Sequence, residues 1–127
     1  MKKPEDTVYG SIAIKAVKLI YDDRYSPENA WKIAVKGKEK GCPRAAFLGL
    51  CFGGFVVDVK DIKQTKLTKN GDYAVTAVNI ISTHPDIPYS SMALWRAVGE
   101  NFDNFPKTHN GQMHVVLALK NMEFLDI

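Results

Sequence analysis

Two stretches of the sequence repeat each other: residues 10–20 read GSIAIKAVKLI and residues 71–81 read GDYAVTAVNII. In both, apolar residues recur at the three- and four-residue spacing of a helix that buries more than one side. Each stretch therefore predicts a buried helix, the first over 7–21 and the second over 71–82. The identical pairs are Gly10/Gly71, Ala13/Ala74, Ala16/Ala77, Val17/Val78 and Ile20/Ile81.

Further matches follow in the same order along both halves of the chain. Trp31 in Ala-Trp-Lys corresponds to Trp95 in Leu-Trp-Arg. The segment 47–50, Phe-Leu-Gly-Leu, is similar to the segment 116–119, Val-Leu-Ala-Leu. Each half thus reads as an alanine-rich helix, a tryptophan helix and an apolar helix.

We therefore expect an all-α fold in which residues 1–127 form a single domain of about six helices. The predicted internal repeat has its copies at 7–52 and 71–122, joined by the segment 55–69. The β-branched residues at 55–59 allow at most one short strand.

A true duplication has a consequence for packing, although amphipathic helices also resemble one another by chance. The third and sixth helices should meet near a pseudo-twofold axis. Gly49 and Ala118 are small enough to permit that close approach.

The remaining helices have recognisable starts. Ser26, followed by Pro27 and Glu28, is a typical N-cap for a second helix that ends near residue 37. A third helix at 43–52 is apolar on almost all sides and belongs in the centre of the fold. A fifth helix follows a serine cap at 90 or 91, and a sixth runs over 112–122.

The charge is unevenly distributed along the chain. The net charge is +3, but residues 32–69 carry nine Lys or Arg against three acids, whereas 70–127 carry three against six. A basic segment can attract a nucleic acid through its phosphates, or it can form an ordinary solvated surface, which we favour. The candidate phosphate contacts are Lys60, Lys63, Lys66 and Lys69.

No segment predicts an export signal or a membrane helix. Residues 1–6 are charged and lack an apolar signal region, and no apolar run approaches the roughly 18 residues that span a bilayer. The two cysteines, Cys42 and Cys51, are roughly 13 Å apart on a predicted helix, too far for a disulfide. These features predict a cytoplasmic protein with two reduced thiols and no membrane partner.

Cys42 is the strongest candidate nucleophile. It stands at a predicted helix start beside Arg44, a position that favours a thiolate, and His109 or His114 could act as its base. No protease signature surrounds it. The competing interpretation is a small buried residue at the start of a helix.

Metal and cofactor motifs are missing from the sequence. There is no His-x-x-x-His, no Cys-x-x-Cys and no glycine-rich phosphate loop. His109 and His114 are five residues apart, a spacing that would splay them on a helix. We expect no metal and no cofactor.

The loop 102–110, FDNFPKTHN, combines aromatic and polar residues between two helices. Such a loop either binds a ligand or uses Phe102 and Phe105 to plug the core, and we favour the plug.

At GCPRAAFLGLC (41–51) and HNGQMHVVLALKN (109–121) the chain resembles an uncharacterised family of small bacterial proteins. The resemblance covers nearly the whole chain, although His114 stands where an acid is expected and Lys120 where a tryptophan is expected. It implies a compact helical domain and brings no assigned activity. Its recurring segments indicate the ligand-binding candidates Cys42, Arg44, His109, Asn110 and Gln112, together with Gly111.

The sequence therefore leaves the function unknown. Our first hypothesis is a non-enzymatic helical binding or interaction protein, with a protein partner or a second copy of the chain possible. The alternatives are a charge-driven nucleic-acid-binding protein and an enzyme that uses Cys42 with His109.

Overall fold

The chain folds into α-helices, as the sequence predicts. The computed structural model describes residues 2–59, 67–86 and 89–127. In the described residues, no helix is long and apolar enough to cross a membrane. The elements in order are η1 (Pro4–Asp6), α1 (Val8–Asp23), α2 (Pro27–Ala34), α3 (Gly41–Phe52), α4 (Lys69–Thr83), α5 (Ser91–Gly99) and α6 (Gln112–Asn121).

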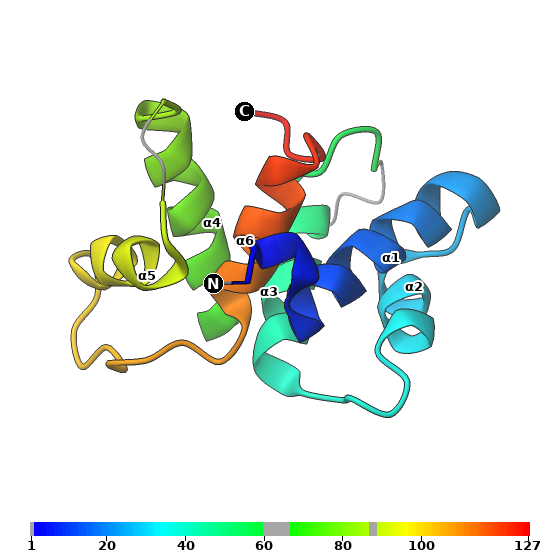
Figure 1. Cartoon of the computed structure of the whole chain (residues 1–127), viewed down its shortest axis with the longest axis horizontal. Helices are drawn as coiled ribbons and strands as arrows, with labels where there is room; N and C mark the ends of the chain where they lie inside the picture. The colour runs from blue at the N-terminus through cyan, green and yellow to red at the C-terminus, as the bar shows by residue number, and fades with distance from the viewer. Residues whose placement is uncertain (1, 60–66, 87–88) are drawn as a thin grey trace.

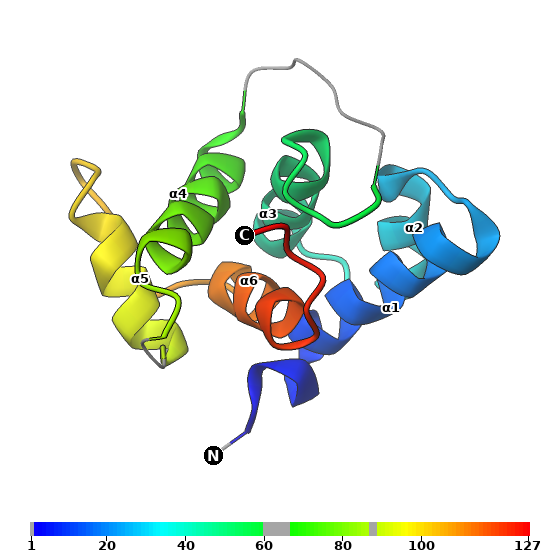
Figure 2. The ribbon, with the colours of Figure 1, turned by 90° about the horizontal axis from the view of Figure 1, so that it is seen from above.

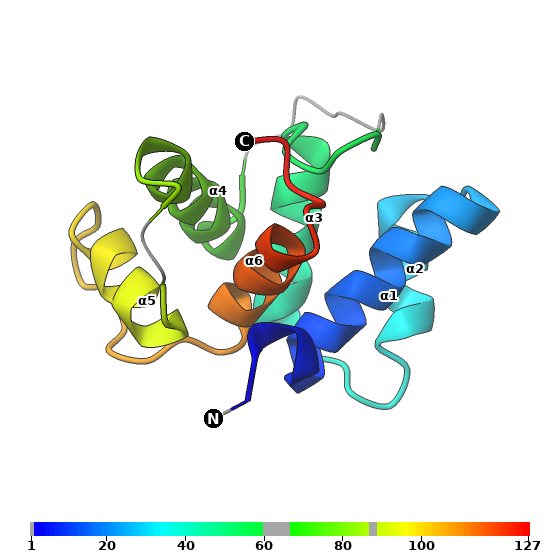
Figure 3. The ribbon, with the colours of Figure 1, turned by 45° about the horizontal axis from the view of Figure 1, so that its top comes forward.

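Helices α3 and α6 form the centre of the molecule (Figure 1). Helices α1 and α2 lie on one side of them and α4 and α5 on the other, an arrangement that Figures 2 and 3 show from two further directions. Seven of the 12 residues of α3 and seven of the 10 residues of α6 are buried. The expectation that the apolar third helix lies in the centre is confirmed.

Several helix boundaries differ from the sequence-based ones. Helix α4 begins at Lys69, two residues before the expected start, because the Thr68 hydroxyl accepts a hydrogen bond from the Gly71 N–H at 3.1 Å. Helix α1 continues to Asp23 and ends where Arg24 adopts a left-handed conformation with φ 58°. Helix α3 already begins at Gly41, whereas α2 ends at Ala34, before the expected 37.

Each half of the chain packs its first helix against the third helix of the other half. Helix α1 contacts α2 of its own half and α6 of the other. Helix α4 correspondingly contacts α5 and α3, and α3 contacts α6. These contacts correspond when the two halves are exchanged, whereas the contact of α4 with α6 has no counterpart of similar size between α1 and α3.

Helices α3 and α4 approach each other closely. A Cβ atom added to Gly49 would lie 2.7 Å from the Cα atom of Gly71, closer than real side chains approach a backbone. Gly49 therefore permits the approach of α3 to α4, whereas the expected role of Gly49 and Ala118 in the approach of α3 to α6 stays a prediction. Glycine is required here because the two backbones touch.

The segments that follow α3 and α6 run antiparallel to each other. Val56 and Leu125, both buried, form an isolated β-bridge, which is all that the described part of 55–59 contributes to strand structure. Two backbone hydrogen bonds flank the bridge, and they join equivalent positions of the two halves in opposite directions. They run from Val57 N–H to the Phe124 carbonyl (2.8 Å) and from Asp126 N–H to the Phe55 carbonyl (2.9 Å).

Helices α3 and α6 also end in the same way. Gly54 and Glu123 occupy corresponding positions with positive φ values of 81° and 61°. Three hydrogen bonds from a backbone N–H to a backbone carbonyl at the end of α3 have counterparts at the end of α6. Given as donor to acceptor, they are 53 to 49 and 122 to 118, 54 to 51 and 123 to 120, and 55 to 50 and 124 to 119. These matches support the duplication, which stays a prediction.

Candidate functional site

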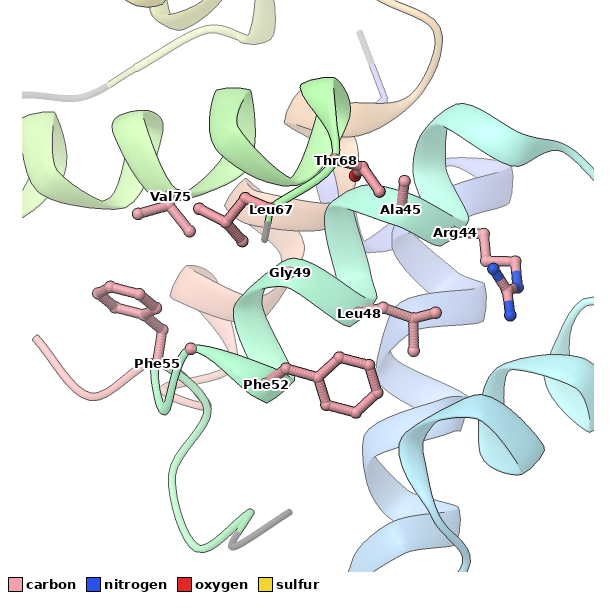
Figure 4. A pocket seen from close by; sticks show the side chains of 10 residues that line it. Arg44, Ala45, Leu48, Gly49, Phe52, Phe55, Leu67, Thr68 and Val75 are labelled. Carbon is pink, nitrogen blue, oxygen red and sulfur yellow. The ribbon is translucent and has the colours of Figure 1, made fainter. Parts of the chain in front are cut away.

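A pocket of about 270 Å³ lies between α3 and the start of α4. Its walls are mainly apolar, with Leu48 and Phe52 contributed by α3 and Leu67 and Val75 by the α4 side (Figure 4). The lining residues in the described part of the chain are Arg44, Ala45, Leu48, Gly49, Phe52, Gly53, Phe55, Leu67, Thr68 and Val75. The contact between Gly49 and Gly71 fixes how closely the two helices meet beside it.

Arg44 is the one charged residue among the described residues that line the pocket. Arg44 lies at one end of the row of side chains, and Phe55 and Val75 lie at the other (Figure 4). Arg44 is exposed on α3, and no hydrogen bond or ion pair holds it within the described part of the chain. The pocket therefore combines an apolar interior with a cation at its edge.

A second cluster surrounds the start of α6. Gly111 adopts φ 96°, and its N–H donates to Nδ1 of His109 at 3.1 Å. This turn folds the His109 ring back onto His114, with ring centroids 4.6 Å apart, and toward Trp95 at 5.9 Å. The expectation that the two histidines splay apart is wrong, because His109 precedes the helix and the turn at Gly111 redirects it.

The electrostatics of this cluster favour neutral histidines. The pKa of His109 is lowered to about 4, first by burial and then by the charges of His114 and Lys40. Burial also lowers the pKa of His114. A neutral ring is what allows Nδ1 of His109 to accept the Gly111 hydrogen bond. A base with a pKa near 4 is poorly matched to proton transfer at neutral pH.

Gln112 has a structural role in the same turn. Its side chain is only 2% exposed, and its amide oxygen accepts a hydrogen bond from the Asn110 N–H. Its Nε2 donates to Oδ1 of Asn70 at 2.8 Å, which connects the start of α6 to the start of α4. The amide of Gln112 is thereby committed to holding α4 and α6 of the second half together.

The five ligand-binding candidates do not form one site. His109, Asn110 and Gln112 share the turn before α6, whereas Arg44 lines the α3–α4 pocket. Cys42 is a free, partly buried thiol in the first turn of α3, and no hydrogen bond joins it to His109 within the described residues. Cys51 is buried, and no disulfide joins the two cysteines. The catalytic pairing of Cys42 with His109 stays a prediction.

The lysine and loop predictions have different outcomes. Lys69 is exposed at the first position of α4, and Lys60, Lys63 and Lys66 lie outside the described residues. Phe102 and Phe105 pack on the core against Tyr73, with ring centroids 4.9 Å from it in both cases. In the described ranges, no group of three or more metal-ligating side chains gathers.

The comparisons with known proteins identify a family and no function. The model of the family described as "Family of unknown function (DUF6979)" matches residues 6–126. The chain belongs to this family. No curated protein and no solved structure matches the chain.

The sequence alone did not reveal the α3–α4 pocket of this DUF6979 protein. Its apolar residues come from α3, from the segment after it and from the α4 side, and each segment alone reads as core. One available signal was the pair Gly49 and Gly71, because two glycines in apolar helices mark a place where backbones approach.

Proposed function

We propose that this protein is a non-enzymatic binding protein that holds a small apolar molecule in the pocket between α3 and α4. The observation that carries the proposal is the pocket itself, with about 270 Å³ of space and mostly apolar walls. Ligand sites in proteins are typically concave and apolar with a few polar groups. A cavity of ~150 Å³ already accepts benzene, so this one has room for a ligand of roughly ten carbon atoms.

Two observations support binding over catalysis. The lowered pKa of His109 makes it a weak general base at neutral pH. The ring of His109 contacts Gly111, His114 and Trp95, and no hydrogen bond joins it to Cys42 within the described residues. Nucleic-acid binding, a protein partner and a homodimer stay predictions, since no contact between described residues favours them.

The test uses a neutral apolar probe, 1-octanol, followed by amide NMR shifts of the full-length protein. We expect saturable shifts at Gly49, Gly53 and Val75. The variant Val75→Trp should abolish them, because the indole occupies the pocket from a half-buried position on α4. The matched control is Ile14→Trp, the aligned position of α1, which lines a different, more open hollow of about 370 Å³ and should leave the shifts unchanged.

Two results would overturn the proposal. One is the absence of saturable shifts in the wild-type protein. The other is equal binding of octanol by Val75→Trp in a sample whose amide spectrum shows a folded protein, since the probe would then sit elsewhere.

A further inference from the structure

We propose that the ligand of the α3–α4 pocket is an apolar carboxylic acid whose carboxylate pairs with Arg44. This inference rests on the proposed function and specifies the class of ligand. It starts from the charge of the lining: among the described lining residues, Arg44 is the single ionisable group and no acid is present.

Arg44 is available for a ligand. It is exposed, it lies on α3 one turn before Leu48, and no carboxylate pairs with it within the described ranges. A guanidinium presents its N–H groups as a planar fork that fits a carboxylate with two parallel hydrogen bonds. An ammonium-bearing ligand would instead be repelled by the positive charge of Arg44, which no described carboxylate neutralises.

The start of α4 adds to the positive potential. Thr68, the N-cap of α4, lines the pocket, and Lys69 is the first residue of this 15-residue helix. The N-terminal end of a helix carries a partial positive charge and favours anions. The Arg44 side chain and the N-terminal end of α4 therefore both favour a negatively charged ligand group.

The arrangement along the pocket favours an amphipathic ligand. Arg44 lies at one end, and the apolar groups of Phe55 and Val75 lie at the other (Figure 4). A ligand with a carboxylate at one end and a chain or single ring at the other matches this order. The volume of about 270 Å³ selects a small acid over a long-chain lipid.

The experiment compares three probes of equal chain length, namely octanoate, 1-octanol and octylammonium, by amide NMR titration of the full-length protein at pH 7. We expect octanoate to bind at least fivefold more tightly than octanol, and octylammonium to bind more weakly than octanol. In Arg44→Gln, octanoate should lose this advantage while the affinity for octanol stays unchanged. The control Arg96→Gln removes a helix arginine at a different hollow and should preserve the preference.

The possible outcomes separate this inference from the proposed function. Equal binding of octanoate and octanol by the wild-type protein would overturn the carboxylate inference and leave the apolar pocket intact. A preference for octanoate that survives in Arg44→Gln would overturn the role of Arg44. Binding of none of the three probes would overturn both proposals.

Discussion

The two halves of the molecule share their helices and differ in the segment between the second and third helix. In the first half this segment is residues 35–40, and in the second it is residues 100–111. The shared parts carry matching backbone hydrogen bonds at the ends of α3 and α6. The difference teaches that the helices set the scaffold, whereas the longer segment adds side chains that the first half lacks.

The longer segment changes the surroundings of the equivalent tryptophans. Trp95 donates from Nε1 to the Pro106 carbonyl at 2.9 Å and lies beside Phe105, with ring centroids 4.2 Å apart. Trp31 stacks on Phe47 at 5.1 Å, and its buried Nε1 has no partner among the described residues. Both side chains are 1% exposed, so the same burial is achieved with and without a hydrogen bond.

Helix η1 packs at the start of the first half. It contacts both α1 and α6, and Nδ2 of Asn121 donates to Oε1 of Glu5 at 2.7 Å. The corresponding positions of the second half are 65–67, of which the structure describes Leu67 alone, and Leu67 lines the pocket.

The largest expected effect is at the close contact between α3 of the first half and α4 of the second. Gly49→Ala should reduce the free energy of unfolding by about 3 kcal/mol, because its Cβ would collide with the Gly71 backbone. The corresponding position of α6 carries Ala118 without such a constraint. Urea unfolding followed by far-ultraviolet circular dichroism measures the loss.

The control for this substitution is Gly41→Ala. Nothing lies within 4 Å of a Cβ built at Gly41, so this change should alter the stability by less than about 1 kcal/mol. Equal stabilities of Gly49→Ala and the wild-type protein would contradict the close approach of α3 and α4.

The tryptophan comparison predicts unequal effects of the same substitution. Trp95→Phe should cost about 2 kcal/mol, since it removes the hydrogen bond to Pro106 together with part of a buried ring. Trp31→Phe should cost less than about 1 kcal/mol, because removing an unpartnered buried N–H offsets the lost packing. Urea unfolding of both variants measures the difference, and equal costs would show that the hydrogen bond of Trp95 contributes nothing.

The histidine cluster, present only in the second half, predicts a pH dependence. The pKa of His109 in the folded protein is about 4, below its ordinary value of 6.5, so the unfolded chain binds the proton first as the pH falls. Stability contributed by the neutral ring is therefore present above pH 6.5 and is lost between pH 6.5 and 4. Because the ring is only half-buried, we expect a loss of about 1 to 2 kcal/mol.

The measurement is urea unfolding of wild type and His109→Gln at pH 7 and pH 4.5. The variant should lose less stability than the wild-type protein over this interval, whereas replacing the exposed His84 by Gln should leave the loss unchanged. The lowered pKa values of Glu5 and Glu39 also weaken the fold on acidification, but they act equally in all three proteins. Identical losses in wild type and His109→Gln would contradict the role of His109.

The sequence predicted the helices and their order because these depend on local patterns. The serine caps before α2 and α5, the proline at the start of α2 and the apolar periodicity of α1 and α4 are all readable in short windows. The boundary of α4 was wrong because Thr68 caps it ahead of a glycine that reads as a helix breaker.

The candidate site was less predictable because it depends on tertiary contacts. Arg44 was singled out for its place beside Cys42, yet it lines a pocket made with α4. The spacing of His109 and His114 suggested separation, whereas the positive φ of Gly111 brings their rings together. A short window of sequence predicts neither the conformation of the turn at Gly111 nor the packing of the first helix of each half against the third helix of the other half.

The smallest effects should come from the matching caps of the two tryptophan helices. Ser26 accepts from the Asn29 N–H at 3.3 Å, and Ser90 accepts from the Ala93 N–H at 3.1 Å. Replacing either serine by alanine should cost about 0.5 to 1 kcal/mol, with the shorter bond of Ser90 at the upper end.

Thermal and urea unfolding of Ser26→Ala and Ser90→Ala measure these costs side by side, and Ser11→Ala on α1 is the control for losing a serine that caps nothing. The Ser11 hydroxyl donates to the Val8 carbonyl within its own helix, where alanine is the better residue, so this variant should keep or slightly gain stability. A cost at one cap alone would show that the halves use their second helices differently. Equal costs would extend the match between the halves from α3 and α6 to α2 and α5, which leaves the intervening segments as the place where the two halves diverge.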